Sequence, residues 1–259
     1  MQIPIFQVDA FTSRLFAGNP AAVCPLESWL PDEKLQSIAA ENNLSETAFF
    51  IPEGDGYRIR WFTPSVEVDL CGHATLASAF VIFEGIGFKG NEVRFQSKSG
   101  ELLVRRDGDR LALDFPARPA EHCQVHPRLI DALGTVPLQV LASRDYLVIY
   151  ESEEQVRTLQ PAMDLLAAID RFAVIVTAPG KEVDFVSRFF APAQGVPEDP
   201  VTGSAHCTLI PYWSRRLGKK DLHALQVSAR GGELWCRYDG DRVHIGGSCV
   251  LYLDGKIHL

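Results

Sequence analysis

Two short stretches of the sequence combine glycine with side chains that can bind an anion or move a proton. The stretch VDLCGHATLA (68–77) runs into an apolar segment and holds Cys71, Gly72 and His73. The stretch EDPVTGSAHC (198–207) holds Asp199, Gly203 and Ser204. A glycine at the start of a helix lets a ligand approach backbone N–H groups that have no partner within the helix. Both stretches therefore predict helix starts that bind a carboxylate or a similar anion.

A third stretch, LSETAFF (44–50), places an acid where the chain enters an apolar strand. Partial loss of water at such an edge is expected to raise the pKa of Glu46 toward the range that suits proton transfer. Asp199, ahead of the second helix start, is its natural partner carboxylate. Two other interpretations stay open. Glu46 could be a solvated or capping-box acid after Ser45, and Asp199 could be a helix N-cap.

Cys71 and His73 allow two further chemistries, a thiol nucleophile and a metal site. No partner base stands in register with Cys71, so its simplest interpretation is a small buried residue at the end of a strand. A zinc site needs four ligands, and no second Cys/His pair has the spacing to supply them. The glycines lack the strand–GxGxxG–helix context of a dinucleotide site. The sequence therefore predicts no metal ion and no dinucleotide.

The chain is a tandem repeat. GELLVRRDGDRLAL (100–113) matches GELWCRYDGDRVHI (232–245), 132 residues later, at 8 of the first 11 positions. RWFTP (60–64) faces RFFAP (188–192) in the same order, and Gly72 faces Gly203. Three matches in one order indicate a duplication, so we expect two similar halves with the ligand site in the cleft between them. The second half has no acid in register with Glu46, which makes that site asymmetric.

Each half carries short alternating segments rich in Val, Ile, Phe and Tyr, which are typical of strands. A helix is predicted after them at 73–86 and again at 204–217, and the first is apolar all round, so strands must enclose it. Pro211 should kink or shorten the second helix. Further helices are predicted at 31–42 and 161–169, and hairpin turns at the two DGD triplets. With 116–127 as linker, the halves are 1–117, with Glu46, and 118–259, with Asp199.

The composition is that of an ordinary globular protein, with 46% hydrophobic and 22% charged residues. The net charge of −8 argues against a nucleic-acid surface, and no apolar run is long enough to cross a membrane. Six cysteines without any CxxC pair are most simply free thiols of a cytoplasmic protein.

The segments SETAFF, RWFTPSVEVDLCGHAT and EDPVTGSA resemble the signatures of the PhzF-like family, and FQVDAFTSRLFAGNPAAV resembles that family's opening. The resemblance implies a diaminopimelate epimerase-like α/β (α+β) fold: two pseudo-symmetric halves, each a mostly antiparallel, barrel-like sheet around a central helix. It also implies a homodimer and a cofactor-independent isomerase that shifts a proton on a small, cyclic amino-acid-like carboxylate. By the same resemblance Glu46 is the general acid/base, His73 and Asp199 are the other catalytic groups, and Gly72, Gly203 and Ser204 bind the substrate carboxylate.

Two alternatives remain. Epimerases of this fold use two facing cysteines, but PVTG stands where the second would be, and Cys207 lies one turn into the helix. A racemase or epimerase would therefore depend on Cys71 alone, with a non-thiol partner. The other alternative is a non-catalytic small-molecule binding protein with the same fold.

Overall fold

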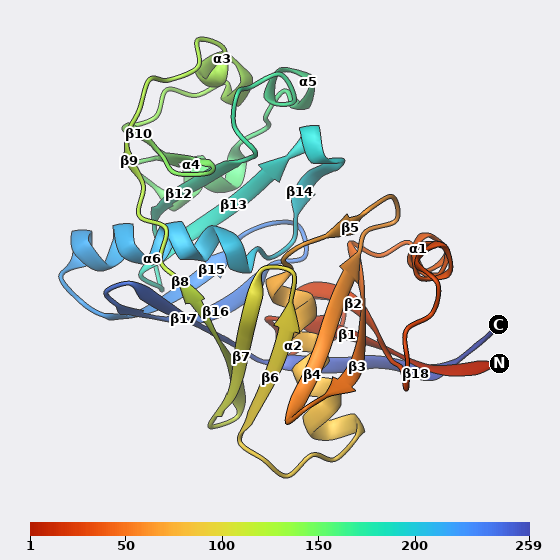
Figure 1. The fold of residues 1–259 in the computed structure, drawn as a ribbon. Coiled ribbons are helices and arrows are strands. Elements are labelled where there is room, and N and C mark those ends of the chain that lie inside the picture. The colour runs from red at the N-terminus through yellow and green to blue at the C-terminus, as the bar shows by residue number, and fades with distance from the viewer. The chain divides into compact units, whose positions relative to one another are not determined.

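The computed structural model describes residues 1–259, and the chain forms two compact units (Figure 1). Unit 1 comprises Met1–Asp114 and Gly246–Leu259, and unit 2 comprises Phe115–Ile245. The division expected from the sequence, 1–117 and 118–259, follows chain order. The structure instead returns the last segment to unit 1, because strand β18 (Cys249–His258) pairs antiparallel with β1 (Gln2–Ala10) along its whole length.

Unit 1 is a curved ladder of strands. It contains β2 (Asn19–Pro25), β3 (Glu46–Glu53), β4 (Gly56–Phe62), β5 (Glu67–Val68), β6 (Glu92–Ser97), β7 (Gly100–Asp107) and β8 (Arg110–Pro116). Most pairings are antiparallel, with parallel pairings at β2–β3 and β4–β6. Helix α1 (Asp32–Asn42) connects β2 to β3 and begins after Pro31, as predicted.

Helix α2 (Gly72–Phe80) forms the core of unit 1 (Figure 1). Every residue from Gly72 to Ala79 is buried, which confirms that strands enclose this apolar helix. The helix is shorter than the predicted 73–86 because it passes into a π-helical turn, Val81–Gly85, where the N–H of Ile86 donates to Val81.

Unit 2 contains five helices or helical turns and nine strands. The helical segments are α3 (Leu129–Leu133), α4 (Glu153–Thr158), α5 (Met163–Leu166), a 3₁₀ turn (Pro192–Gln194) and α6 (Gly203–Leu217). The strands are β9 (Glu121–His122), β10 (Gln139–Ala142), β11 (Tyr146–Ile149), β12 (Val174–Pro179), β13 (Phe185–Ala191), β14 (Val196–Asp199), β15 (Asp221–Gln226), β16 (Gly232–Asp239) and β17 (Arg242–Gly247). The predicted helix at 161–169 is shorter than expected. None of the helices is long and apolar enough to cross a membrane.

The two units repeat one pairing pattern. Antiparallel, parallel, antiparallel, parallel and antiparallel pairings follow one another from β1 to β7 and again from β10 to β16. Helix α2 stands between β5 and β6, and α6 stands between β14 and β15. The duplication inferred from three sequence matches is thus visible in the hydrogen-bonded registers. Both DGD triplets form turns, with positive φ at Gly108 and Gly240.

Pro211 does not shorten α6, which runs unbroken from Gly203 to Leu217. Proline lacks the N–H that would bond the carbonyl four residues earlier, at Cys207. The N–H of Arg118 donates to that carbonyl instead, at 2.8 Å. The missing helical bond is therefore replaced by a contact that ties the segment after β8 to the helix.

Candidate functional site

The starts of α2 and α6 lack the side-chain caps that helix starts usually have. Residues Cys71 and Thr202 are the N-caps, both with extended backbones, and neither side chain bonds a backbone N–H of the first turn. No acid stands in the first turn of either helix. By contrast, Ser152 and Gln155 form a complete capping box at α4. At both glycine-led helix starts, backbone N–H groups of the first turn therefore remain available to bind an anion.

Glu46 is the first residue of β3, and His73 is the second residue of α2. Nε2 of His73 lies 3.2 Å from Oε2 of Glu46, and the Glu46 side chain is 17% exposed. Helix α1 ends at Asn42, with the C-cap Asn43 in the left-handed conformation. Glu46 therefore does not belong to a helix start, and the capping-box interpretation is wrong. It is an acid at the edge of a strand, as the alternative from the sequence predicted.

Asn19 fixes the tautomer of His73. The amide Nδ2 of Asn19 donates to Nδ1 of His73 at 3.1 Å, and both residues are buried. Since Nδ1 accepts, the ring proton stands on Nε2, the nitrogen that faces Glu46. Burial lowers the pKa of His73 to about 3. The contact with Glu46 is therefore one between a neutral imidazole N–H and a carboxylate, rather than an ion pair.

Cys71 lies beside the same ring. Its sulfur is 3.5 Å from Nδ1 of His73, and the residue is buried. Glu46, Cys71 and His73 present ligand atoms within 4.8 Å of one another, as a metal site would. However, the sulfur lies at Nδ1 and the carboxylate at Nε2, so one ion cannot use both through a single nitrogen. These residues fit a hydrogen-bonded acid/base group better than a metal centre.

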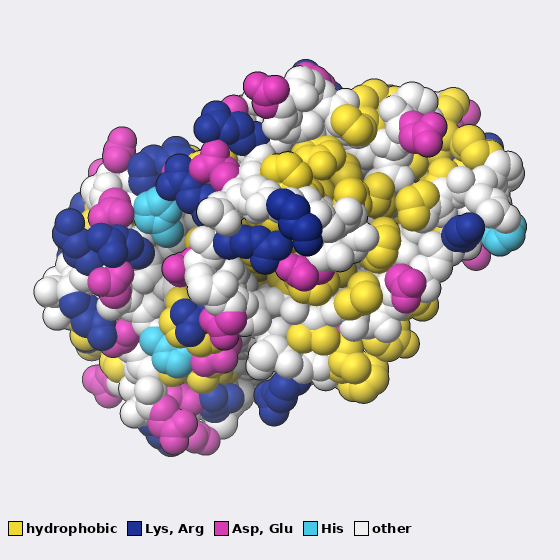
Figure 2. Space-filling view, turned by 90° about the horizontal axis from the view of Figure 1, so that it is seen from below, with side chains coloured by type: hydrophobic (Ala, Val, Ile, Leu, Met, Phe, Trp, Pro, Cys, Tyr) yellow, Lys and Arg dark blue, Asp and Glu magenta, His cyan; other side chains and the backbone are white.

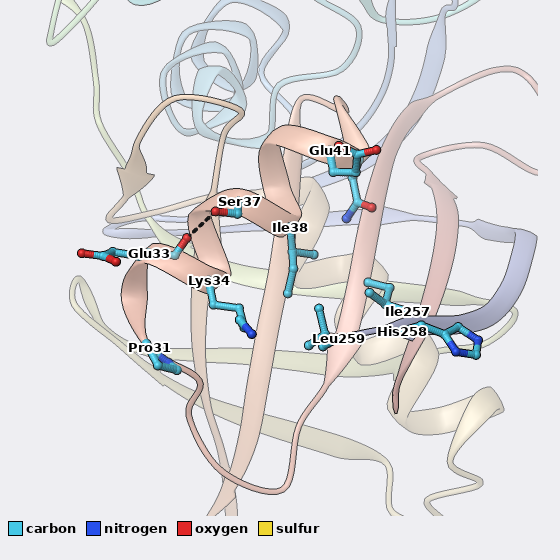
Figure 3. Close-up of a pocket in the computed structure, with 10 residues that line it drawn as sticks. Pro31, Glu33, Lys34, Ser37, Ile38, Glu41, Ile257, His258 and Leu259 are labelled. Carbon is cyan, nitrogen blue, oxygen red and sulfur yellow. Dashed lines mark hydrogen bonds between the residues drawn. The ribbon is translucent and has the colours of Figure 1, made fainter. Parts of the chain in front are cut away.

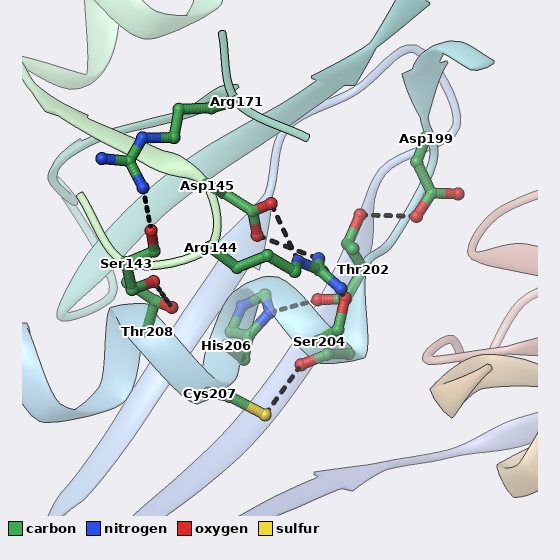
Figure 4. Close-up of polar contacts among 11 residues, drawn as sticks. Ser143, Arg144, Asp145, Arg171, Asp199, Thr202, Ser204, His206, Cys207 and Thr208 are labelled. Carbon is green, nitrogen blue, oxygen red and sulfur yellow. Dashed lines mark hydrogen bonds and ion pairs between the residues drawn. The ribbon is translucent and has the colours of Figure 1, made fainter. Parts of the chain in front are cut away.

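Asp199 ends β14, three residues before Thr202, the N-cap of α6. The hydroxyl of Thr202 donates to Oδ2 of Asp199 at 2.5 Å (Figure 4). Nε2 of Gln226 donates to both the hydroxyl of Thr202 and the carbonyl of Asp199. Because the N-cap is Thr202, the interpretation of Asp199 as an N-cap is wrong. Gln226 also accepts from the N–H of Thr202, so its side chain fixes the segment from Asp199 to Thr202 that leads into α6.

The start of α6 carries Ser204 beside an arginine that the sequence alone did not single out. Nη2 of Arg144 lies 3.4 Å from Oγ of Ser204 (Figure 4). The guanidinium forms two bonds of 2.9 Å with the buried carboxylate of Asp145. The only sequence signal was position, since Arg144 directly follows a predicted strand in VLASRDYLV.

The structure thus brings Glu46, Gly72 and His73 together in unit 1, and Asp199, Gly203 and Ser204 together in unit 2. Asn19 was missed, although it lies in the family-like stretch FAGNPAAV. Cys207 is buried, which raises the pKa of its thiol to about 11 and makes it a poor nucleophile. A groove of about 600 Å³ lies between α1 and the end of β18 (Figure 3), and none of the predicted site residues lines it.

Comparisons with known proteins agree with this architecture over the full length. The family model described as phenazine biosynthesis-like protein matches residues 8–255. An uncharacterized isomerase of Pseudomonas aeruginosa is 58% identical, with 100% of both chains covered. The crystal structure of a PhzF-family phenazine biosynthesis protein from Enterococcus faecalis has a TM-score of 0.98 and 48% identity, and 100% of each chain is covered.

A more distant structure shares the fold alone. It is a hydroxyproline epimerase from Agrobacterium vitis, with a TM-score of 0.62 and 10% identity, covering 99% of this chain and 92% of that one. The epimerase-like fold of two similar halves, expected from the resemblance, is confirmed. The chain therefore belongs to the PhzF-like family of phenazine biosynthesis-like proteins and is an isomerase.

Proposed function

We propose that this isomerase moves a proton between two carbons of a small, cyclic amino-acid-like carboxylate, without a cofactor. Glu46 removes the proton and returns it, and His73 and Asp199 assist. Gly72, Gly203 and Ser204 offer backbone and hydroxyl donors to the carboxylate.

The observation that carries this proposal is the contact between Glu46 and a neutral His73. Nε2 of His73 lies 3.2 Å from Oε2 of Glu46 without an aligned hydrogen bond. The positive end of an N–H dipole this close to a carboxylate favours its ionised form, which is the form that accepts a proton from carbon. When Glu46 becomes protonated, the same N–H loses its charged neighbour, so the proton is readily passed on. The imidazole stays neutral here, because its depressed pKa keeps it from titrating near neutral pH.

Hydrogen exchange identifies the reaction even when its product is not known. Cyclic and linear amino acids, dihydro-hydroxyanthranilate among them, are incubated with the protein in D₂O and followed by proton NMR. The proposal expects deuterium to enter a C–H of at least one compound. Binding of a compound without any exchange would instead support the non-catalytic binding protein.

A one-cysteine racemase has less support from the geometry. The sulfur of Cys71 faces Nδ1 of His73, the nitrogen that already accepts from Asn19. That nitrogen is thus a shared acceptor rather than a base reserved for the thiol. Cys71→Ala is expected to retain exchange activity, and its complete inactivation would favour the racemase.

We further propose a cytoplasmic homodimer. The six cysteines are free thiols, as in a reducing compartment. Unit 1 presents exposed apolar residues that the fold does not need: Leu15, Phe16, Leu251, Tyr252 and Leu253. Figure 2 shows a face on which apolar side chains gather. Such a face marks an interaction surface.

The backbone conformation of Phe16 is further evidence for an interaction surface here. Phe16 has φ 68°, a conformation that bulky residues rarely adopt, and its side chain is 70% exposed. The buried Asp9 holds it by accepting from its N–H at 2.9 Å, and its ring packs edge-on against Tyr252. A strained backbone that displays an aromatic ring to water is stabilised when a partner covers it.

A second copy of the chain is the occupant that the charges favour. All residues from 251 to 256 of β18 are exposed. If two β18 strands met antiparallel about Gly255, each Asp254 would face Lys256 of the partner subunit. Opposite charges across a strand pair favour that register. A two-fold contact of this kind is self-complementary.

A further inference from the structure

We propose that Arg144 is a substrate-binding residue that makes the start of α6 selective for a carboxylate. The proposal deepens the function proposed above, because it names the side chain that recognises the acid group of the substrate. Arg144, Ser204 and the first turn of α6 would form one receptor, all within unit 2.

The guanidinium of Arg144 is held in place from two sides. Nε and Nη2 donate to the two carboxylate oxygens of Asp145, each at 2.9 Å, and the Asp145 side chain is only 2% exposed. The guanidinium also stands over the ring of Phe172, 4.4 Å from its centroid. A paired and stacked arginine loses little further freedom when it binds a ligand, so this one is preorganised.

The guanidinium of Arg144 and the hydroxyl of Ser204 both retain hydrogen-bond donors that a ligand could use. Nη1 of Arg144 takes part in none of these contacts, and Nη2 reaches Ser204 only at 3.4 Å, the long end of a hydrogen bond. Ser204 Oγ accepts in that contact, so its own O–H is still to be donated. An anion between the two residues would receive hydrogen bonds from both, together with the uncapped N–H groups of the helix.

Two acids lie near the start of α6, and they differ in how strongly they would repel a bound anion. The Arg144–Asp145 pair has no net charge, but Asp145 is only 2% exposed and Arg144 is 36% exposed, so a ligand meets the guanidinium rather than the carboxylate. Asp199 accepts from the hydroxyl of Thr202 (Figure 4). Thr208 and Ser143 bond each other at 3.1 Å and close the side of the helix next to the Arg144 loop.

Unit 1 has a polar contact at the corresponding place. The strand registers put Ser143 and Arg144 where Asn19 and Pro20 stand in unit 1. The repeat likewise puts Ser204 where His73 stands. In unit 1 Asn19, the first residue of β2, bonds the second residue of α2. In unit 2 the bond to the second residue of α6 comes from Arg144, one position after the equivalent of Asn19. The contact in unit 2 is thus made from the neighbouring position, and by a cation.

Binding of 2-aminobenzoate, measured by isothermal titration calorimetry, tests Arg144 independently of turnover. Hydrogen bonds to a charged group contribute about 1.5–3 kcal/mol, so Arg144→Gln is expected to weaken binding roughly 10-fold to 100-fold. Arg144→Lys should recover part of the affinity. Arg215→Gln removes the same charge at the far end of α6 and should leave the affinity unchanged.

The methyl ester of 2-aminobenzoate separates a carboxylate contact from a structural effect. Wild type and Arg144→Gln should bind the ester equally weakly, since no carboxylate remains to recognise. Arg144→Gln leaves Asp145 buried without its partner, so the double variant R144Q/D145N is measured in parallel and should show the same loss. Equal affinity of wild type and Arg144→Gln for the acid would overturn the inference, as would an equal loss for acid and ester.

The failure of the proposed function would look different. Deuterium exchange should depend on Glu46, which moves the proton, whereas affinity for the carboxylate should depend on Arg144. If no compound exchanges deuterium but carboxylate binding depends on Arg144, the proposed proton transfer is contradicted, while the proposed role of Arg144 in binding is supported. A wild-type protein that does not bind 2-aminobenzoate would overturn the receptor.

Discussion

The chemistry at the scale of single residues depends on which nitrogen of His73 carries the proton. Asn19 occupies Nδ1, so the proton stands on Nε2 and faces Glu46 at 3.2 Å. An imidazole that titrated near neutral pH would change this contact within the working range of the protein. Burial prevents that, because it penalises the charged ring.

The two buried histidines make stability depend on pH. Burial lowers the pKa of His73 from 6.5 to about 3 and that of His206 from 6.5 to about 4. Below pH 6.5 the unfolded chain takes up protons at both positions, while the folded protein does not. The free energy of unfolding should therefore fall between pH 7 and pH 5, by about 2 kcal/mol for each histidine. Urea unfolding at the two pH values measures it.

His206→Gln isolates one of these contributions. His206 is fully buried in unit 2, and its Nδ1 bonds the carbonyl of Thr202 at 2.8 Å. The variant should lose about 2 kcal/mol less than wild type between pH 7 and pH 5. His122→Gln, at an exposed position, serves as the control and should behave as wild type. An unchanged pH dependence in His206→Gln would contradict the assignment.

The residues that the sequence did not predict are those that act through distant contacts. Glu46, His73 and Ser204 stand in short motifs whose local pattern indicates a strand edge or a helix start. Asn19 reaches His73 across 54 residues of sequence, and Arg144 reaches Ser204 across 60. No local pattern encodes such a pair, because the strand pairing of each unit creates it.

At the scale of elements, β14 depends on one partly buried ion pair. Arg188 on β13 bonds both carboxylate oxygens of Glu198, at 2.7 and 2.9 Å, and its Nη1 donates to the carbonyls of Val156 and Leu159. Glu198 directly precedes Asp199, so the pair holds the strand that carries this proposed catalytic acid. The side chain of Arg188 is 10% exposed and that of Glu198 is 23% exposed.

Arg188→Ala should therefore destabilise the protein strongly. Removing Arg188 leaves the partly buried carboxylate of Glu198 without its partner, which costs about 3 kcal/mol of unfolding free energy, the low end for a buried pair. Urea unfolding at pH 7 measures this loss. Arg58 forms a similar two-point contact with Glu53, but on the surface. Arg58→Ala should leave the midpoint unchanged, and an equal loss in both variants would contradict the role of burial.

The elements themselves followed largely from sequence. The second long helix was predicted at 204–217 and occupies Gly203–Leu217, because a glycine-led start and an apolar face fix it locally. The first was predicted too long, since nothing in its apolar run marks the change to a π-helical turn. Pro211 was predicted to kink or shorten the second helix, and it does not shorten it, because the compensating bond from Arg118 comes from outside the helix.

At the scale of the whole molecule, the duplication was readable from sequence, but the return of β18 was not. The repeat matches end near residue 245, and nothing after them indicates which half the last strand joins. Its partner is β1, at the opposite end of the chain, with Gln2 facing His258. A pairing between the two ends of a chain leaves no signal in either segment alone.

The proposed dimer predicts a change of assembly for substitutions in unit 1. Phe16→Ser or Tyr252→Ser should convert a dimer into a monomer, since each removes a large apolar contact from the centre of the surface. Light scattering after size-exclusion chromatography gives the mass. Val136→Ser changes an equally exposed apolar residue of unit 2 and should remain dimeric. A monomeric wild type, or a dimer that survives both substitutions, would contradict this surface.

The most direct test of the central claim compares wild type with Glu46→Gln in D₂O. The compound that wild type deuterates is followed by proton NMR at equal protein concentrations, and calorimetry verifies that both proteins bind it. General acid/base catalysis contributes about 10²–10⁴-fold, so exchange by Glu46→Gln should fall by at least about 100-fold while binding persists. Equal exchange rates in the two proteins would show that Glu46 does not move the proton.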